Sequence, residues 1–249
     1  MRYFIKLAYN GTNYHGWQTQ PNAVSVQETL EKALSLLLKN KIEIVAAGRT
    51  DSGVHAKEMF AHFDFEEAID SDYWIPKLNS YLPKDIVIYS IFEVNSEAHA
   101  RFDAIERTYE YHIHRRKDAF ECHNSWLFPH PLDIDRMNDA CKLLLNHTDF
   151  ECFSKLHTDV KTFFCKLTHA EWTSLGDRCI FTISADRFLR NMVRAIVGTL
   201  IDIGTGKTSL DDLEQILASK NRSKAGFSVP AHGLYLTEVH YPYIPFRAR

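Results

Sequence analysis

Residues 26–38 read VQETLEKALSLLL, and their apolar side chains recur every three or four positions. That spacing puts them on one stripe of an α-helix. The flanking residues 2–9 (RYFIKLAY) and 42–47 (IEIVAA) are predicted strands. Further strands at 59–65 and 85–94, with a helix at 71–78 capped by Ser71, complete a β-α-β-β-α-β order. This order is the split βαβ pattern of ferredoxin-like and RRM-like domains.

The second half of the chain shows a similar pattern. Strands are predicted at residues 108–114, 163–173, 178–183 and 234–241, and helices at 134–145 and 189–201. We therefore expect an α+β protein of two split-βαβ halves, with mainly antiparallel sheets, helices on one face and an active-site cleft between the halves. No low-complexity linker marks a boundary, so we expect it near residues 101–107, with domains at 1–103 and 104–249.

Composition narrows the class of protein. The 249 residues are 45% hydrophobic and 24% charged, which is ordinary for a globular protein. Five cysteines, an odd number without a C-x-x-C pair, argue against a disulfide framework or a thiol zinc site and favour the reducing cytosol. The N-terminus does not resemble a signal peptide, and no run of about 18 apolar residues predicts a membrane span. The net charge of −3 counts only mildly against a nucleic-acid partner, because phosphate contact depends on a local patch.

The candidate for chemistry is residues 46–56, AAGRTDSGVHA, which leave an apolar strand and enter a loop. Glycines bracket Arg49, Thr50 and Asp51, and loops anchored on strands often carry catalytic groups. A nearby guanidinium keeps a carboxylate ionised, so that it can act as nucleophile or general base. On these residues alone, a surface turn with a local salt bridge is about as good an interpretation.

The segment GRTDSGVHA resembles the active-site signature of the tRNA pseudouridine synthase A family, usually GRTDAGVHA. Ser52 is the one departure within it. Matches in the same order continue along the whole chain: YNGT (9–12), GWQ (16–18), VQ (26–27), LN (78–79), LP (82–83), DI (85–86), HARFDA (99–104), RTYEY (107–111), RFLRNMVR (187–194), VG (197–198), PA (230–231), GL (233–234) and Leu236. Two further departures are KEM at 57–59, where Gly-Gln-Val is usual, and Ala98, where Phe is common. Both are expected to alter RNA contacts rather than chemistry.

The resemblance implies roles for individual residues. Asp51 is then the catalytic aspartate, Arg49 its neighbour in the loop and Arg194 the arginine that pairs with it. Tyr109 stacks on the target base and Leu236 lines the uracil pocket. The implied activity is isomerisation of uridine to pseudouridine at positions 38–40 of the tRNA anticodon arm, by a cytoplasmic homodimer without metal or cofactor. The route stays open among addition to C6, attack on C1′ and removal of a ribose proton.

Basic residues supply the expected RNA contacts. In a helix over 189–201, Leu189, Met192, Val193, Ile196, Val197 and Leu200 share one stripe, which leaves Arg187, Arg190 and Arg194 facing outward for phosphate contact. Arg101, Arg107, Arg115, Arg116 and Lys117 extend this patch. A loop with Tyr14, His15 and Trp17 is a weaker candidate for contact with RNA.

Other features have simpler interpretations. His112 and His114 are expected to be exposed strand histidines rather than metal ligands. Residues 204–208 (GTGKT) echo a P-loop, but the first glycine is missing and a helix precedes them. Asp133 is expected to cap a helix. Two alternative functions remain at this point: a non-catalytic RNA-binding module of the same fold, and a magnesium-dependent hydrolase with an aspartyl nucleophile.

Overall fold

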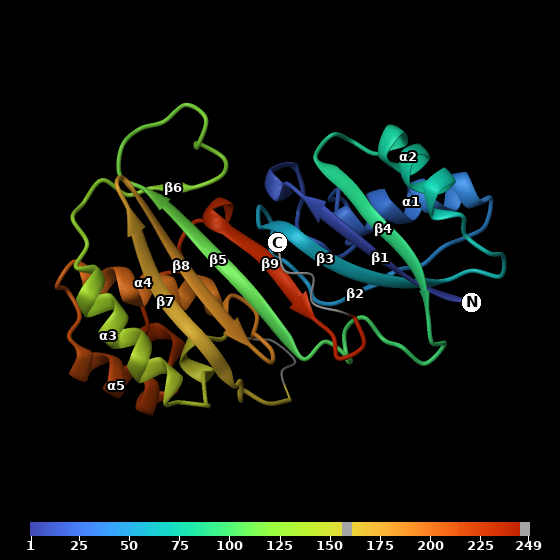
Figure 1. The fold of residues 1–249 in the computed structure, drawn as a ribbon. Coiled ribbons are helices and arrows are strands. Elements are labelled where there is room, and N and C mark those ends of the chain that lie inside the picture. The colour runs from blue at the N-terminus through green and yellow to red at the C-terminus, as the bar shows by residue number, and fades with distance from the viewer. Residues whose placement is uncertain (156–160, 245–249) are drawn as a thin grey trace. The chain divides into compact units, whose positions relative to one another are not determined.

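The computed structural model describes residues 1–155 and 161–244. It is a mixed α/β structure with a mainly antiparallel sheet, in agreement with the expected class (Figure 1). The chain forms two compact units. Unit 1 comprises Met1–Ile105 and the C-terminal segment that begins at Tyr235, and unit 2 comprises Glu106–Leu234. The expected domains at 1–103 and 104–249 differ from these units in the C-terminal segment, which belongs with the N-terminal part of the chain.

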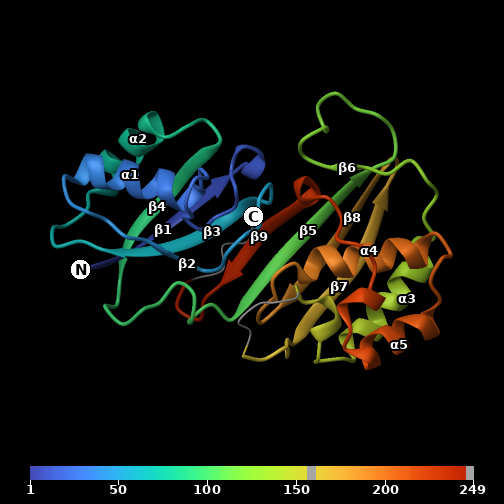
Figure 2. The same cartoon turned by 180° about the vertical axis from the view of Figure 1, so that it is seen from behind.

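Unit 1 has five strands and two α-helices among its described residues. Their bounds are β1 Arg2–Tyr9, α1 Val26–Leu38, β2 Val45–Ala46, β3 His55–Asp64, α2 Ser71–Tyr81, β4 Ile86–Val94 and β9 Leu234–His240, with a short 3-10 turn, η1, at Gly11–Asn13. Strand β1 lies between β3 and β4 and is antiparallel to both. Helices α1 and α2 cover one face of this sheet (Figures 1 and 2).

The edge of β3 away from β1 is shared by two strands. At one end, β2 pairs antiparallel through Val45 with His62 and through Ala46 with Ala61. At the other end, β9 pairs parallel, with His55 opposite Tyr235 and Ala56 opposite Leu236. The expected strand over 42–47 is only two residues long. Side chains of α1 bond the residues before it: the Ile42 N–H donates to the Ser35 hydroxyl at 2.9 Å, and the Ile44 N–H donates to the Glu31 carboxylate at 3.0 Å.

The core of unit 1 covers both faces of β1. Phe4, Ile5 and Leu7 are all fully buried although their side chains alternate between faces. On the helix-free face, the ring of Tyr241 lies edge-on to Phe4 at 5.4 Å between centroids and to Phe60 at 5.3 Å. The residues after β9 thus act as the second layer of the core, which explains why the C-terminal segment belongs to unit 1.

In unit 2 the strands β5, β8 and β7 are neighbours in this order and are antiparallel. Its elements are β5 Glu106–His114, β6 Trp126–Leu127, α3 Ile134–Leu145, η2 Glu151–Phe153, β7 Leu167–Leu175, β8 Arg178–Ala185, α4 Met192–Gly204, α5 Leu210–Ser219, η3 Arg222–Lys224 and η4 Ala231–Gly233. The helices α3 and α4 cover one face of the sheet, and α5 packs beside α3 (Figure 2). The predicted helix 134–145 matches α3, and Asp133 caps it by accepting a hydrogen bond from the Arg136 N–H at 3.0 Å.

Some local predictions were wrong. Asp70, not Ser71, caps α2, because the Ser71 hydroxyl instead donates to the Ile91 carbonyl. The helix expected from residue 189 begins at Met192, after Asn191 turns the chain with a φ of 67°. Helix α5 and strand β6 were not predicted. Among the helices formed by the described residues, none combines the length and apolarity needed to cross a bilayer.

Candidate active site

Asp51 lies in a turn between β2 and β3. The Val54 N–H donates to the Asp51 carbonyl at 3.1 Å, and Gly53 closes the turn with a φ of 77°. Such a positive φ favours glycine, which explains the second glycine of the segment. The Asp51 side chain is half-buried and Arg49 is exposed. The turn therefore presents a carboxylate and a guanidinium two residues apart.

Residues 9–17 hold this turn in place through hydrogen bonds. The buried hydroxyls of Tyr9 and Thr50 are 2.9 Å apart and hydrogen-bonded. The Trp17 N–H donates to the Thr50 carbonyl at 3.2 Å. The Gly53 N–H and the Ser52 hydroxyl both donate to the Tyr14 carbonyl, at 3.2 and 3.3 Å. Hydrogen bonds thus tether the residues on both sides of Asp51, which restricts the backbone of the turn that carries it.

Two glycines make this close packing possible. A Cβ at Gly11 would lie 2.0 Å from the Val54 carbonyl oxygen, and one at Gly16 would lie 2.4 Å from that of Thr50. Gly16 also has a φ of 86°. Both positions therefore require glycine. The two glycines in residues 9–17 were the signal in the sequence, but the reason for them lies in Val54 and Thr50, which are remote in the chain.

Tyr14 and Trp17 support the turn from the core, so the expectation that they meet RNA was wrong. Tyr14 is 5% exposed and Trp17 is 2% exposed. The Tyr14 hydroxyl donates to Asp85 at 2.6 Å, and burial together with this carboxylate raises the pKa of the phenol. The aromatic ring of Trp17 packs against Tyr9 at 6.0 Å between centroids. Of the three residues, only His15 is exposed.

His55 is a residue of the site that sequence reasoning missed. It is 1% exposed, and its Nδ1 accepts a hydrogen bond from the Gly11 N–H at 3.0 Å. The imidazole also stacks on the ring of Tyr235, with 4.6 Å between centroids. His55 therefore joins the Asp51 turn, the N-terminal 3-10 turn and β9. Its place within GRTDSGVHA was the available signal.

Leu236 lies in the same unit as Asp51. It is 2% exposed and opposes Ala56, five residues beyond Asp51, in the β3–β9 register. Two of the residues that depart from the family pattern at 57–59 have contacts within unit 1. The ammonium of Lys57 lies 5.2 Å from the ring centroid of Tyr235, while Glu58 pairs with Lys6 at 2.6 Å and accepts from the Val239 N–H at 3.0 Å.

The remaining candidate residues for base and carboxylate contact lie in unit 2. Tyr109 is half-buried in β5, and the ring of Phe188 meets it edge-on at 5.1 Å between centroids. Arg194 is half-buried, and its Nε donates to the Val229 carbonyl at 2.7 Å. This hydrogen bond fixes one edge of the guanidinium within the unit.

The predicted stripe of three arginines on one helix was wrong. Arg187 and Arg190 precede α4, and α4 itself is buried on nearly all sides, with Arg194 among its few half-buried positions. Arg190 is exposed, whereas Arg187 donates to the Thr162 carbonyl at 3.4 Å. The apolar periodicity was real, but a helix covered on every face has no outward stripe.

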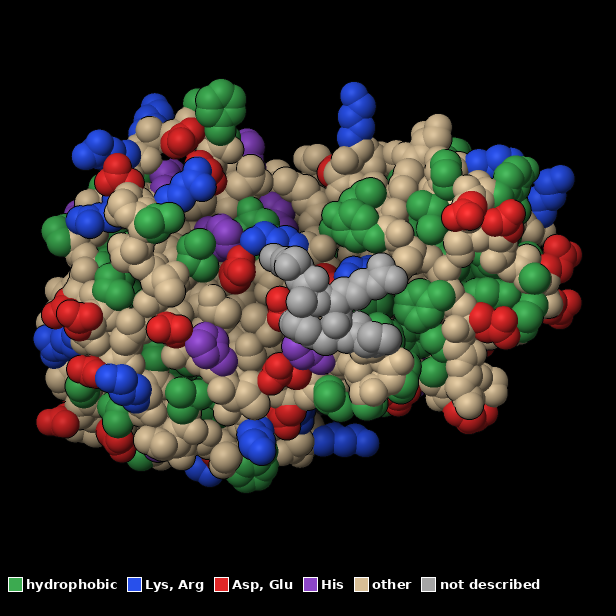
Figure 3. Space-filling model, viewed as in Figure 1, with side chains coloured by type: hydrophobic (Ala, Val, Ile, Leu, Met, Phe, Trp, Pro, Cys, Tyr) green, Lys and Arg blue, Asp and Glu red, His purple; other side chains and the backbone are tan. Residues whose placement is uncertain are grey.

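The other predicted arginines are distributed over both units. Arg107 donates to the Asp186 carbonyl at 2.8 Å, and Arg101 is exposed beside the ring of Phe102. On the face shown in Figure 3, basic and acidic side chains are interspersed. Arg116, for example, pairs with Asp177 at 3.1 Å.

The histidines of β5 are less exposed than predicted. His114 is 5% exposed, and His112 is half-buried and lies 2.9 Å from Glu110. Across residues 1–155 and 161–244, no group of three or more His, Cys, Asp or Glu side chains is placed to hold a metal ion.

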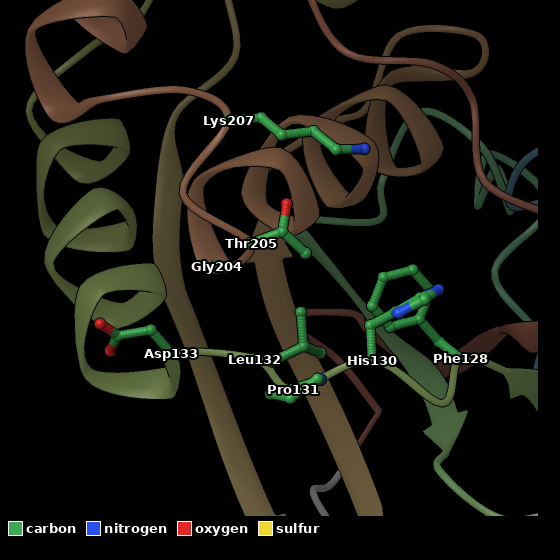
Figure 4. A pocket seen from close by; sticks show the side chains of 8 residues that line it. All are labelled: Phe128, His130, Pro131, Leu132, Asp133, Gly204, Thr205 and Lys207. Atoms are coloured by element: carbon green, nitrogen blue, oxygen red, sulfur yellow. The ribbon is translucent and has the colours of Figure 1, made fainter.

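A cavity of about 880 Å³ lies in unit 2, where the loop before α3 meets the end of α4. Figure 4 shows the residues that line it: Phe128, His130, Pro131, Leu132, Asp133, Gly204, Thr205 and Lys207. It includes part of the segment that echoed a P-loop, but Gly204 and Thr205 here end a helix. None of the candidate catalytic or RNA-binding residues lines this cavity.

Comparison with known proteins identifies the family of this chain. The family model described as tRNA pseudouridine synthase matches residues 6–103 and 140–242. The tRNA pseudouridine synthase A of Parabacteroides distasonis is 54% identical over 242 residues, covering 97% of this chain and 96% of the relative. The proteins of the same name from Bacteroides fragilis and Bacillus licheniformis are 54% and 40% identical, each over 97% of this chain and over 96% and 99% of their own. This chain belongs to the tRNA pseudouridine synthase family.

Proposed function

We propose that this protein isomerises uridine to pseudouridine at positions 38–40 of the tRNA anticodon arm, with Asp51 as the catalytic carboxylate. Family membership supports an isomerase that acts on tRNA. The single observation that carries the assignment of Asp51 is the bracing of its turn. Four hydrogen bonds from residues 9–17 hold the positions immediately before and after it.

The chemistry needs one well-placed carboxylate. In the reaction the C1′–N1 bond breaks and a C1′–C5 bond forms, the proton on C5 leaves and N1 gains a proton. Nothing is oxidised and no group is transferred to another molecule. Asp51 acts by addition to C6, by attack on C1′ or by removal of a ribose proton. All three routes need an ionised oxygen held against a base that has left its stack.

Tyr109 and Leu236 hold the uracil in this proposal. A tyrosine platform contributes about 1–3 kcal/mol per stacked base. Leu236 supplies an apolar wall, and its position opposite Ala56, five residues beyond Asp51, supports this role. Arg194 pairs with the carboxylate of Asp51, and Arg49 extends from the same turn.

Arg101, Arg107, Arg187 and Arg190 contact phosphates in the proposed complex. Because the face shown in Figure 3 carries both signs of charge, we expect these arginines to position the tRNA rather than to attract it from a distance. The protein acts as a homodimer in the cytoplasm, and its five free cysteines suit that reducing compartment. We also infer that unit 1 is a split βαβ domain, since the order β4-β1-β3 with β2 beside β3 is that of this motif.

The test is pseudouridine formation on a tRNA transcript. The wild-type protein is expected to form pseudouridine at positions 38, 39 or 40, mapped by carbodiimide-dependent stops of reverse transcription. Asp51→Asn keeps the size of the side chain and one acceptor oxygen but removes its charge, so it should bind tRNA and form no product. Product formation by this variant would overturn the assignment. A transcript with cytidine at all three positions is the substrate control.

A further inference from the structure

His55 is a buried imidazole with one ring nitrogen bonded to a backbone group. It is 1% exposed, and its Nδ1 accepts a hydrogen bond from the Gly11 N–H at 3.0 Å. A ring nitrogen that accepts an N–H carries no proton of its own, so this imidazole is neutral with its proton on Nε2. The ring of Tyr235 stacks on it at 4.6 Å between centroids, with an interplanar angle of 25°. The stack fixes the plane of the imidazole and hence the direction in which Nδ1 points.

Successive hydrogen bonds lead from His55 back to the backbone beside Asp51. The Tyr14 N–H donates to the Gly11 carbonyl at 3.0 Å. The Tyr14 carbonyl in turn accepts from the Gly53 N–H at 3.2 Å, and Gly53 lies two residues after Asp51. His55 is therefore connected to the Asp51 turn through η1 as well as along the chain.

The turn η1 is held between β4 and the Asp51 turn. The Asp85 carboxylate, just before β4, accepts from the Tyr14 hydroxyl at 2.6 Å. His55 bonds the same element from the other side, through the Gly11 N–H. The contact there is close, because a Cβ at Gly11 would lie 2.0 Å from the Val54 carbonyl oxygen. A shift of η1 is therefore transmitted to the turn, since no empty space lies between them to absorb it.

We propose that His55 is a positioning residue, whose neutral imidazole holds the Asp51 carboxylate in its reactive geometry through the hydrogen bond to Gly11. The inference rests on the proposed function and deepens it, since it names a buried group that acts through Asp51 rather than on the uridine. A displacement of a reacting group by about 1 Å can cost about a hundredfold in rate. Loss of the Nδ1 acceptor should therefore lower kcat, while KM for tRNA stays the same.

The experiment compares His55→Asn with His55→Gln in pseudouridine formation on a full tRNA transcript. Asn places its side-chain oxygen close to the position of Nδ1, so it can still accept from the Gly11 N–H. Gln is one methylene longer and extends toward the position of Nε2, which leaves that N–H without its acceptor. We expect His55→Gln to lower kcat about tenfold or more with KM within about twofold, and His55→Asn to keep kcat within about threefold of the wild type.

His62→Gln is the matched control. His62 lies in the same strand and is 5% exposed, and its Nδ1 accepts from the Ala100 N–H at 3.1 Å. It is seven residues from His55, toward the opposite end of β3 from the Asp51 turn. His62→Gln should therefore lower the urea midpoint about as much as His55→Gln and keep kcat within about twofold of the wild type.

Hydrogen exchange of the Gly53 amide reports on the turn independently of activity, because local opening exposes this N–H. Exchange should be faster in His55→Gln but unchanged in His55→Asn and in His62→Gln. Wild-type kcat in His55→Gln, or an equal loss of kcat in His62→Gln, would overturn the proposal, and so would a rise in KM with kcat unchanged. Failure of the proposed function has a different signature, since Asp51→Asn would then form product while the Gly53 amide would still respond to His55.

Discussion

The hydroxyl of Tyr9 and the hydroxyl of Thr50 form a buried hydrogen bond of 2.9 Å that joins the end of β1 to the residue before Asp51. The two side chains are 4% and 9% exposed. Neither hydroxyl can turn to bulk water if the other is removed. The bond therefore links the stability of unit 1 to the position of the proposed catalytic carboxylate.

Tyr9→Phe is expected to lower the free energy of unfolding by about 1–3 kcal/mol, because it leaves the Thr50 hydroxyl buried and unsatisfied. It should also lower kcat, since Thr50 precedes Asp51. Urea unfolding and single-turnover assays measure the two effects. A double-mutant cycle with Thr50→Val provides the control, because loss of both hydroxyls should cost less than the sum of the single changes. Additive losses would show that this contact does not join the two residues energetically.

Gly16→Ala is expected to lower both the stability and the activity of the protein, although it adds only one methyl group. The new Cβ would lie 2.4 Å from the Thr50 carbonyl oxygen, and the backbone already has a φ of 86°. Moving Thr50 displaces Asp51, so kcat should fall at least tenfold, with a loss of stability of about 1–3 kcal/mol. Gly176→Ala is the matched control, because Gly176 has a φ of 60° with no atom within 4 Å of the added Cβ. It should lose about 1 kcal/mol of stability and keep its activity.

Acid should destabilise the protein through His62. Burial, followed by the charges of Arg2 and His99, lowers the pKa of this imidazole from 6.5 to about 4. Its Nδ1 accepts a hydrogen bond from the Ala100 N–H at 3.1 Å, which holds it neutral in the folded state. The unfolded chain therefore binds the extra proton between pH 6.5 and pH 4, and stability is lost as pH falls through this window.

The loss is at most about 3 kcal/mol between pH 6.5 and pH 4. Urea midpoints measured at intervals of half a pH unit will show it. His62→Asn keeps an acceptor for the Ala100 N–H without a titrating group, so its stability should vary less with pH in this range. An equally steep pH dependence in this variant would assign the effect to other groups.

Two substitutions at Glu58 separate its charge from its hydrogen bond. Glu58→Gln retains an acceptor for the Val239 N–H and loses the partly exposed pair with Lys6, so it should cost less than about 1 kcal/mol. Glu58→Ala also removes the acceptor and should cost about 1–3 kcal/mol. Thermal unfolding monitored by circular dichroism compares the two. Equal losses would mean that the hydrogen bond to β9 contributes nothing.

Local patterns predicted most of the elements. The helices at Val26–Leu38 and Ile134–Leu145 and the strand at Arg2–Tyr9 match the expected bounds, because each has a period and flanking residues of its own. The prediction for residues 42–47 was too long, since side chains of α1, rather than β3, bond the backbone N–H groups of Ile42 and Ile44. The exposure of the helix that ends at Gly204 was predicted wrongly. A sequence period shows which side chains share a face of a helix, but it does not show how many faces are covered.

By itself the sequence determined the mixed α/β class, the glycine-bracketed turn that holds Asp51 and the family to which the chain belongs. These follow from local spacing and from short motifs, which need no knowledge of distant neighbours. Only the tertiary structure decided that Tyr14 and Trp17 are buried supports, that His55 joins three segments and that β9 completes unit 1. Those facts depend on which segments remote in the chain lie against one another, and burial and pairing are properties of that packing rather than of any residue's neighbours in sequence.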